Sequence, residues 1–223
     1  MTLVSRLLRC LVLATIFGAL GVVFFNSQRY NGDARLANEG AKSTPKQVLI
    51  LRHAEKSNDD TDIHLRSRGA ARAAALPALF VTSPVFPTKQ SPFATPDFIF
   101  AAKPTKHSQR SLETVTPLAK ALDDMPISQK QANDDFPQVV EKLFSQEKYF
   151  RKTVLICWHH GNIPPLAHAI VARAKNRDKL RDLVPKNWDS SVFDRVWVIA
   201  FDEASNATFA NQPQRLMFGD AKK

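Results

Sequence analysis

The chain has 223 residues, of which 44% are hydrophobic and 23% are charged. This composition is typical of a globular domain, and it excludes a disordered chain, a collagen-like repeat and a multi-span membrane protein. The length suits one α/β domain, and the 2 cysteines are too few for a disulfide-stapled mini-fold or a cysteine-rich zinc site. The net charge of +10 invites a nucleic-acid partner, but no nucleic-acid-binding motif accompanies it, so we expect none.

Residues 1–25 have the pattern of a signal anchor or signal peptide. Arg6 and Arg9 precede an uncharged apolar run, Cys10 to Phe25, which covers about 24 Å as a helix. We favour an uncleaved membrane anchor, because the run ends in two bulky phenylalanines where a cleavage site needs small residues. The two arginines place the body of the protein outside the cytoplasm, in the periplasm or the extracellular space. Cleavage of the segment would instead make the protein secreted.

The remaining chain divides into a polar stalk, residues 26–45, and a folded domain, residues 46–223. Apolar runs predict strands at 47–51, 98–101, 154–158 and 195–201, with a short last strand at 215–218. Periodic apolar patterns and caps predict helices at 67–76, 108–122, 136–144, and from 164 towards 181. This alternation predicts an α/β fold: a three-layer sandwich with a mostly parallel central sheet and helices on both faces.

Two of the predicted buried strands end directly at histidine. Arg52 and His53 follow the first strand, and His159 and His160 follow the strand at 154–158. In sheets of this kind ligands bind beyond the carboxyl ends of the strands, so neighbouring strands would bring these side chains to one edge. A lone histidine is more often structural, but the repetition at two strand ends favours a site. If the strand continues, His159 points away from His160, and we expect no function for it.

Three segments in order resemble the histidine phosphatase (phosphoglycerate mutase-like) superfamily. They are LRHAEK at 51–56, RSLET at 110–114 and WHHGNIP at 158–164, and the helix sequence LRSRGAARAAAL at 65–76 is a weaker match. The ordered set in this strand and helix context is much more specific than any one motif. The resemblance implies a phosphatase that hydrolyses phosphate monoesters, or a phosphorylated protein, through a phosphohistidine intermediate. It implies His53 as the nucleophile and His160 as the second histidine.

The residue types suit the transfer of a phosphoryl group. A phosphate monoester carries up to about two negative charges and needs fixed cations and an in-line nucleophile. The guanidinium groups of Arg52 and Arg110 can each donate paired hydrogen bonds to phosphate oxygens. The neutral imidazole of His53 can attack phosphorus, and a protonated His160 can stabilise the developing charge. We expect no metal and no other cofactor, and the expected partners are a phosphorylated small-molecule or protein substrate and a membrane.

The proton donor for the leaving group is not fixed by any motif. Asp134 and Asp135 lie in about the right stretch, and each can act as the acid. They can equally cap the helix that follows them. Asn58 can help to bind phosphate or can only shape its loop. Because the acid is unassigned, the alternative is a non-catalytic phosphate-binding or scaffold domain with the same fold.

The segment 102–109, AKPTKHSQ, is longer than the corresponding part of the superfamily pattern. It carries Lys103, Lys106 and His107, which can recognise a negatively charged substrate. We prefer the interpretation that these residues belong to a solvated loop.

Overall fold

The computed structural model describes residues 44–59, 61–81 and 92–220. The chain divides into two units, 1–40 and 41–223, and every described residue belongs to the second. The predicted anchor and nearly all of the predicted stalk lie outside the described residues. Within the described ranges, no helix combines the length and the apolar character needed to cross a bilayer.

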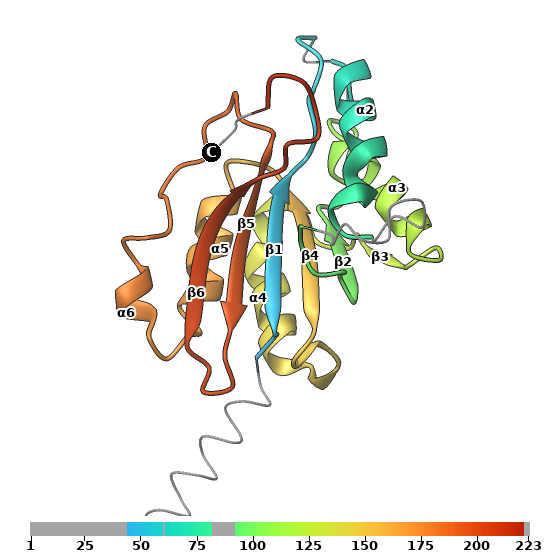
Figure 1. Cartoon of the computed structure of the whole chain (residues 1–223). Helices are drawn as coiled ribbons and strands as arrows, with labels where there is room; N and C mark the ends of the chain where they lie inside the picture. The colour runs from blue at the N-terminus through green and yellow to red at the C-terminus, as the bar shows by residue number, and fades with distance from the viewer. Residues whose placement is uncertain (1–43, 60, 82–91, 221–223) are drawn as a thin grey trace, which may run out of the picture. The chain divides into compact units, whose positions relative to one another are not determined.

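The described residues build a six-stranded sheet with the strand order β3-β2-β4-β1-β5-β6 (Figure 1). The strands are β1 (Gln47–Arg52), β2 (Phe98–Ala101), β3 (Ile127–Ser128), β4 (Thr153–Trp158), β5 (Arg195–Phe201) and β6 (Ala207–Pro213). The first four are joined by parallel pairings, whereas β5 runs antiparallel to both β1 and β6. The predicted mostly parallel α/β sheet is therefore confirmed.

Helices cover the two faces of the sheet (Figure 1). They are α2 (Ser67–Ala75), α3 (Arg110–Ala121), α4 (Phe136–Ser145), α5 (Ile163–Val171) and α6 (Arg177–Leu180), with short 3-10 turns η1 (Leu76–Leu79), η2 (Asn133–Asp135) and η3 (Glu147–Tyr149). The buried side chains of α4 and α5 join one hydrophobic cluster, and those of α3 and η1 join another. These two clusters on opposite faces make the predicted three layers.

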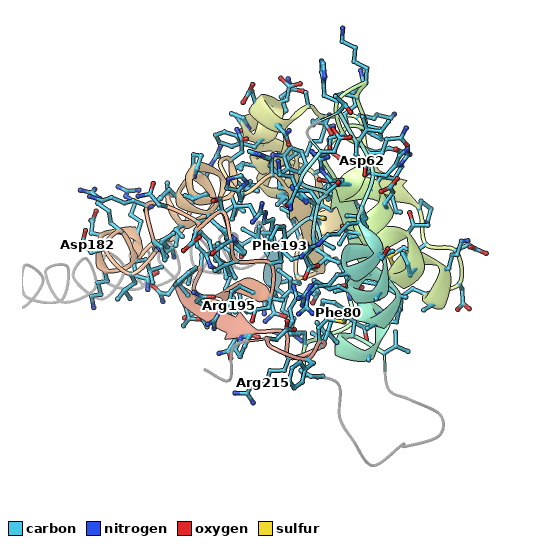
Figure 2. All side chains as sticks on the ribbon, turned by 90° about the horizontal axis from the view of Figure 1, so that it is seen from above. Asp62, Phe80, Asp182, Phe193, Arg195 and Arg215 are labelled. Atoms are coloured by element: carbon cyan, nitrogen blue, oxygen red, sulfur yellow. The ribbon has the colours of Figure 1, made fainter. Side chains whose placement is uncertain are left out.

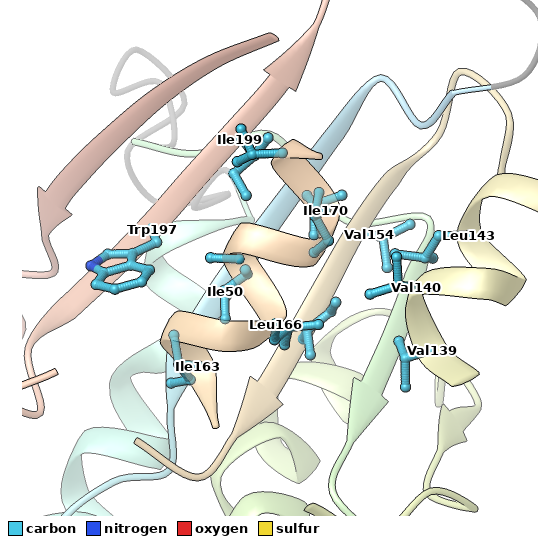
Figure 3. Packing of buried hydrophobic residues seen from close by; sticks show 14 of the residues in the cluster. Ile50, Val139, Val140, Leu143, Val154, Ile163, Leu166, Ile170, Trp197 and Ile199 are labelled. Carbon is cyan, nitrogen blue, oxygen red and sulfur yellow. The ribbon is translucent and has the colours of Figure 1, made fainter. Parts of the chain in front are cut away.

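The central strand β1 shows why the sheet is buried on both faces. Val48 and Ile50 pack into the cluster under α4 and α5, while Leu49 and Leu51 pack into the cluster under α3. All four side chains have no exposed surface. Figure 3 shows Ile50 beside Leu166 and Ile163 of α5. Because successive side chains of a strand point to opposite faces, a continuous apolar run is what a doubly covered strand requires.

The last strand differs from the prediction. It is β6 at Ala207–Pro213, paired with β5 as a hairpin, and residues 215–218 form no strand. Asp202 closes the turn, because its carboxylate accepts hydrogen bonds from the backbone N–H and the side-chain amide of Asn206 at 2.8 and 3.0 Å. An edge strand is half solvated, so β6 carries polar residues and lacks the apolar run that predicts β1, β2, β4 and β5. The two-residue strand β3 was not predicted from the sequence either. The predicted helix from 164 also ends early, at Val171, and α6 is separate.

Candidate active site

The carboxyl ends of β1 and β4 meet because these strands are direct neighbours. In their parallel register Arg52 lies opposite Trp158, the last residue of β4. The backbone N–H of His53 donates to the Trp158 carbonyl at 3.2 Å. The rings of His53 and His159 follow, with their centroids 6.2 Å apart. The structure therefore places the two histidine-bearing strand ends at one edge of the sheet.

His53 is buried, with 3% of its surface exposed, and the structure defines its tautomer. Its Nδ1 lies 2.7 Å from the carbonyl oxygen of Ala54. A carbonyl oxygen only accepts hydrogen bonds, so Nδ1 carries the proton and Nε2 carries the lone pair. Burial lowers the pKa of His53 to about 3, and the nearby positive charges of Arg52 and Arg110 act in the same direction. The ring is therefore neutral at physiological pH, with Nε2 able to act as a nucleophile.

The side chain of Arg52 is held by the loop that follows α6. Its Nη1 donates to the carbonyl oxygens of Ser190 and Val192 at 2.6 and 3.1 Å. The guanidinium carbon lies 3.7 Å from the ring centroid of Phe193, which Figure 2 labels near the centre of the view. Burial, followed by the charge of Arg110, lowers the pKa of Arg52 to about 10, so it stays charged at neutral pH. Its Nε is buried and has no hydrogen-bond partner among the described residues.

Arg110 is the first residue of α3 and is held by the segment 62–65. Its Nη1 donates to the carbonyl oxygen of Asp62 at 2.9 Å, and its Nε is buried without a partner in the described part of the chain. Glu113 fixes the same segment, because its carboxylate accepts the backbone N–H of Leu65 at 2.9 Å and contacts the ring of His64. Two guanidinium groups near His53 thus each keep an unpaired, buried N–H, which is the donor that a phosphate oxygen requires.

Thr114 links two of the three sequence motifs, LRHAEK at 51–56 and RSLET at 110–114. Its Oγ1 accepts the backbone N–H of Ala54 at 2.9 Å and donates to the carbonyl oxygen of Arg110 at 2.7 Å. It therefore fixes the backbone beside His53 to the first turn of α3. The motif containing Thr114 was recognised from the sequence, but this contact joins residues 60 positions apart and no local pattern reports it.

The two adjacent histidines after β4 occupy different surroundings, and His159 does not follow the expectation. β4 ends at Trp158, so the alternation of side chains along a strand does not extend to His159. Its Nδ1 accepts the backbone N–H of Gly161 at 3.2 Å, and its ring faces His53. The His160 ring centroid lies 4.3 Å from that of His159, and its Nδ1 is buried without a partner among the described residues. Burial, and then Arg52, lowers the pKa of His160 to about 4.

A cavity of about 220 Å³ opens beside His53. Its lining consists of residues from the β2–α3 loop, from α3, from η2 and from the two strand ends: His53, Ala102, Lys103, Thr105, His107, Ser108, Arg110, Ser111, Asn133 and His159. This lining includes Lys103 and His107, so the loop 102–109 faces the site, whereas Lys106 is exposed outside the lining. The lining holds cationic and neutral groups and no carboxylate, which favours an anionic ligand.

The predicted acids and Asn58 lie outside this lining. Asp134 is exposed, and its Oδ1 accepts a hydrogen bond from the side-chain amide of Asn162 at 3.0 Å. Asp135 accepts the backbone N–H of Ala132 at 3.2 Å, which is a capping contact at η2. Asn58 is exposed and does not line the cavity. Of the predicted site residues, the lining therefore includes His53 and Arg110, together with His159, for which no function was expected. It does not include the other predicted residues: Arg52, Asn58, Asp134, Asp135 and His160.

Glu55, two residues after His53, belongs to a separate buried charge network. Its carboxylate accepts hydrogen bonds from Arg72 at 2.8 Å and from Arg68 at 3.1 Å, and Arg72 also binds Asp220. Gly69 makes the close packing of α2 possible, because a Cβ there would lie 2.3 Å from the Glu55 carbonyl oxygen. This network fixes the chain after β1. Among residues 44–59, 61–81 and 92–220, no group of three or more His, Cys, Asp or Glu side chains is placed to hold a metal ion.

No family model and no curated protein matches the chain. Solved structures do match it. A protein histidine phosphatase SixA complexed with tungstate has 15% identity and a TM-score of 0.49, over 75% of this chain and 97% of that one. A putative phosphohistidine phosphatase SixA from Agrobacterium tumefaciens has 17% identity and a TM-score of 0.46, over 74% and 96%. A phosphoglycerate mutase from Plasmodium falciparum has 13% identity and a TM-score of 0.45, over 81% and 99%.

By their descriptions these structures are a putative phosphohistidine phosphatase, a protein histidine phosphatase and a phosphoglycerate mutase. Similarities at this level of identity and TM-score concern the fold and assign neither an activity nor a substrate to this chain. The chemistry is therefore argued from its own residues.

Proposed function

We propose that the described domain is a phosphatase that hydrolyses phosphate monoesters, of a small molecule or of a protein, through a phosphohistidine formed on His53. The observation that carries the proposal is the state of His53. Its Nδ1–H is bound to the Ala54 carbonyl oxygen, so the lone pair of a neutral, buried ring is on Nε2. A histidine that is buried only for packing does not require two arginine side chains next to it.

The two arginines supply the phosphate site in this mechanism. Arg52 and Arg110 are each anchored through Nη1 to main-chain carbonyl oxygens, which leaves their buried Nε–H groups for the phosphate oxygens. His53 Nε2 attacks phosphorus in line with the leaving oxygen, and water then cleaves the phosphohistidine. His160, whose Nδ1 is also unpaired, donates to the transferring group when it is protonated.

The second candidate is a non-catalytic phosphate-binding or scaffold domain. It is favoured by one observation: no carboxylate lines the cavity beside His53, and Asp135 serves as a cap. Such a domain would bind phosphate through the same arginines without turning over an ester.

One experiment separates the two candidates. The full-length chain in detergent is assayed on p-nitrophenyl phosphate with and without a chelator, and rapid quench is used to trap an acid-labile phosphoenzyme. We expect turnover that persists in chelator, and the loss of both turnover and label in His53→Ala. His168→Ala on α5, a histidine that lies outside the cavity lining, is the matched control and keeps both. Phosphate binding without turnover would favour the second candidate.

The apolar run from Cys10 to Phe25 supports a further part of the proposal, that the chain is anchored to a membrane with the phosphatase domain on the extracytoplasmic side. A polar stalk of about twenty residues gives such a domain freedom to reach substrates near the bilayer.

A further inference from the structure

The loop between β2 and α3, residues 102–109, is a part of the cavity lining that the proposed chemistry does not use. It contributes Lys103 and His107 to the lining. Resting on the proposed phosphatase function, we propose that Lys103 binds a second negatively charged group of the substrate, a carboxylate or another phosphate. The preferred substrates are then phosphate monoesters whose alcohol part is itself anionic.

The sheet brings the start of this loop to the edge where the site lies. The strands β2, β4 and β1 are consecutive neighbours and run parallel, so their carboxyl ends meet at one edge. His53 directly follows β1, and Lys103 follows β2 after one intervening residue, Ala102. Pairing with β4 continues past the end of β2, because the Ala102 N–H donates to the Cys157 carbonyl oxygen at 3.1 Å. The backbone at Lys103 is therefore fixed beside the site.

Main-chain hydrogen bonds give the loop a defined shape. The Lys103 N–H donates to the carbonyl oxygen of Gln131 at 2.7 Å. Thr105 and Ser108 exchange two main-chain hydrogen bonds, at 2.9 and 3.2 Å, which close a turn that has Lys106 at its tip. Lys103, at the root of the loop, lines the cavity, whereas Lys106 at the tip does not. Two lysines of one loop thus stand in different relations to the site.

The charges in the site leave Lys103 available for a second anion. The phosphate group of a monoester carries up to about two negative charges, and Arg52 and Arg110 supply two positive charges for it. Lys103 adds a third positive charge, and no carboxylate is part of the lining. Within the described part of the chain, no ion pair or hydrogen bond occupies its ammonium group. An anionic group of the substrate is the partner that this charge lacks.

The cavity has room for more than the phosphoryl group. A water molecule takes about 30 Å³ in the liquid, so the cavity of about 220 Å³ exceeds what the four heavy atoms of a phosphoryl group fill. Part of the lining therefore faces the rest of the ester. A lysine carries three donors on a flexible stem and lacks the fixed fork of a guanidinium group. Lys103 therefore selects for charge and tolerates alcohol parts of different shape.

The test uses pairs of substrates that differ in charge and hardly in shape. p-Carboxyphenyl phosphate carries a carboxylate where p-carbamoylphenyl phosphate carries a neutral amide, and the meta isomers offer the same pair at a second position. For each pair, kcat/KM is measured on the full-length protein in detergent, and the ratio of carboxylate to amide is taken. Because both members of a pair are assayed on one preparation, any loss of folded protein cancels from this ratio.

The variants are Lys103→Gln, Lys103→Glu and His107→Gln, with Lys106→Gln as the matched control. Lys106 has the same charge in the same loop and is also exposed, but it lies outside the lining. We expect Lys103→Gln to lower the ratio about three- to fivefold on at least one isomer pair, the range of an exposed ion pair. Lys103→Glu replaces the attraction by a repulsion of similar size and lowers it about tenfold or more. Lys106→Gln is expected to keep the wild-type ratio.

Salt gives a second measurement. Added salt screens the attraction between exposed charges, so the wild-type ratio is expected to fall as the ionic strength rises, and the ratio of Lys103→Gln is expected to fall less.

Equal ratios in wild type and Lys103→Gln on both isomer pairs would overturn the proposal. An equal fall in Lys106→Gln would also overturn it, because the effect would then belong to the general positive charge of the loop. So would a fall in His107→Gln without one in Lys103→Gln. These three outcomes leave the phosphatase function intact. If wild type turns over neither these esters nor p-nitrophenyl phosphate, the proposed function is wrong, and this proposal with it.

Discussion

Thr114→Val tests how the site is assembled. Thr114 is buried, with 2% of its surface exposed, and its Oγ1 is the acceptor for the Ala54 backbone N–H. Valine keeps the shape of threonine and replaces this oxygen with a methyl group, so the N–H beside His53 loses its partner. The hydrogen bond from Thr114 to the Arg110 carbonyl is lost too, but that bond is local to one helical turn.

The expected loss of stability follows from the buried N–H. Leaving such a donor unsatisfied costs about 1–3 kcal/mol. For a domain of this size each kcal/mol corresponds to about 2–4 °C, so the unfolding temperature falls by about 2–12 °C. Activity falls further, because Ala54 also supplies the carbonyl oxygen that holds His53 Nδ1, and a misplacement of about 1 Å can cost about 10²-fold in rate.

Thr116→Val is the matched control for this variant. Thr116 lies in the same helix and donates from Oγ1 to the Leu112 carbonyl at 2.8 Å, which is the same local bond without the second role. Thermal unfolding by circular dichroism and kcat on p-nitrophenyl phosphate are measured for both variants and for Thr114→Ser, which retains the oxygen. If Thr114→Val matches Thr116→Val in stability and kcat, the proposed contact between the motifs is not what positions His53.

Further outcomes are expected for the Glu55 charge network and for the membrane anchor. Arg72→Met leaves the buried carboxylates of Glu55 and Asp220 without their main partner and lowers the free energy of unfolding by about 3–5 kcal/mol, whereas Arg181→Met, from an exposed ion pair, lowers it by less than about 1 kcal/mol. Burial opposes ionisation of Glu55 and Asp220, but hydrogen bonds from Arg72 hold the pKa of each carboxyl below its ordinary value. The difference in free energy of unfolding between wild type and Arg72→Met, measured in urea, therefore narrows as the pH falls through those lowered pKa values. A difference that stays constant with pH would contradict this. Deletion of residues 10–25 is expected to release the protein from membranes. In spheroplasts that carry the full-length chain, added protease is expected to digest the domain while cytoplasmic marker proteins survive. Protection of the domain from protease would show the opposite orientation.

The position of His53, the proposed nucleophile, could be predicted from the sequence because it depends on local patterns. A buried parallel strand is a continuous apolar run, and ligand-binding side chains follow its carboxyl end. Both rules apply to β1, which leads directly to Arg52 and His53. The two strand ends were predicted to meet only if β1 and β4 are neighbours, and the observed parallel register shows that they are.

The support of Arg52 could not be predicted in this way. Its anchors are the carbonyl oxygens of Ser190 and Val192, which are 138 and 140 positions away, and the ring of Phe193. A backbone carbonyl has no signature in the sequence, since every residue carries one. Phe193 follows no periodic apolar pattern, because its ring packs against a guanidinium group and not into either face of the sheet.

His159 shows where a rule of secondary structure stops being valid. The expectation that it would point away from the site assumed that β4 continues, but the strand ends at Trp158. Past that residue the backbone turns into α5, and the Gly161 N–H directs the ring of His159 towards the cavity. At this strand end it is His159 that lines the cavity, whereas His160 lies outside the lining and its Nδ1 is buried without a partner among the described residues.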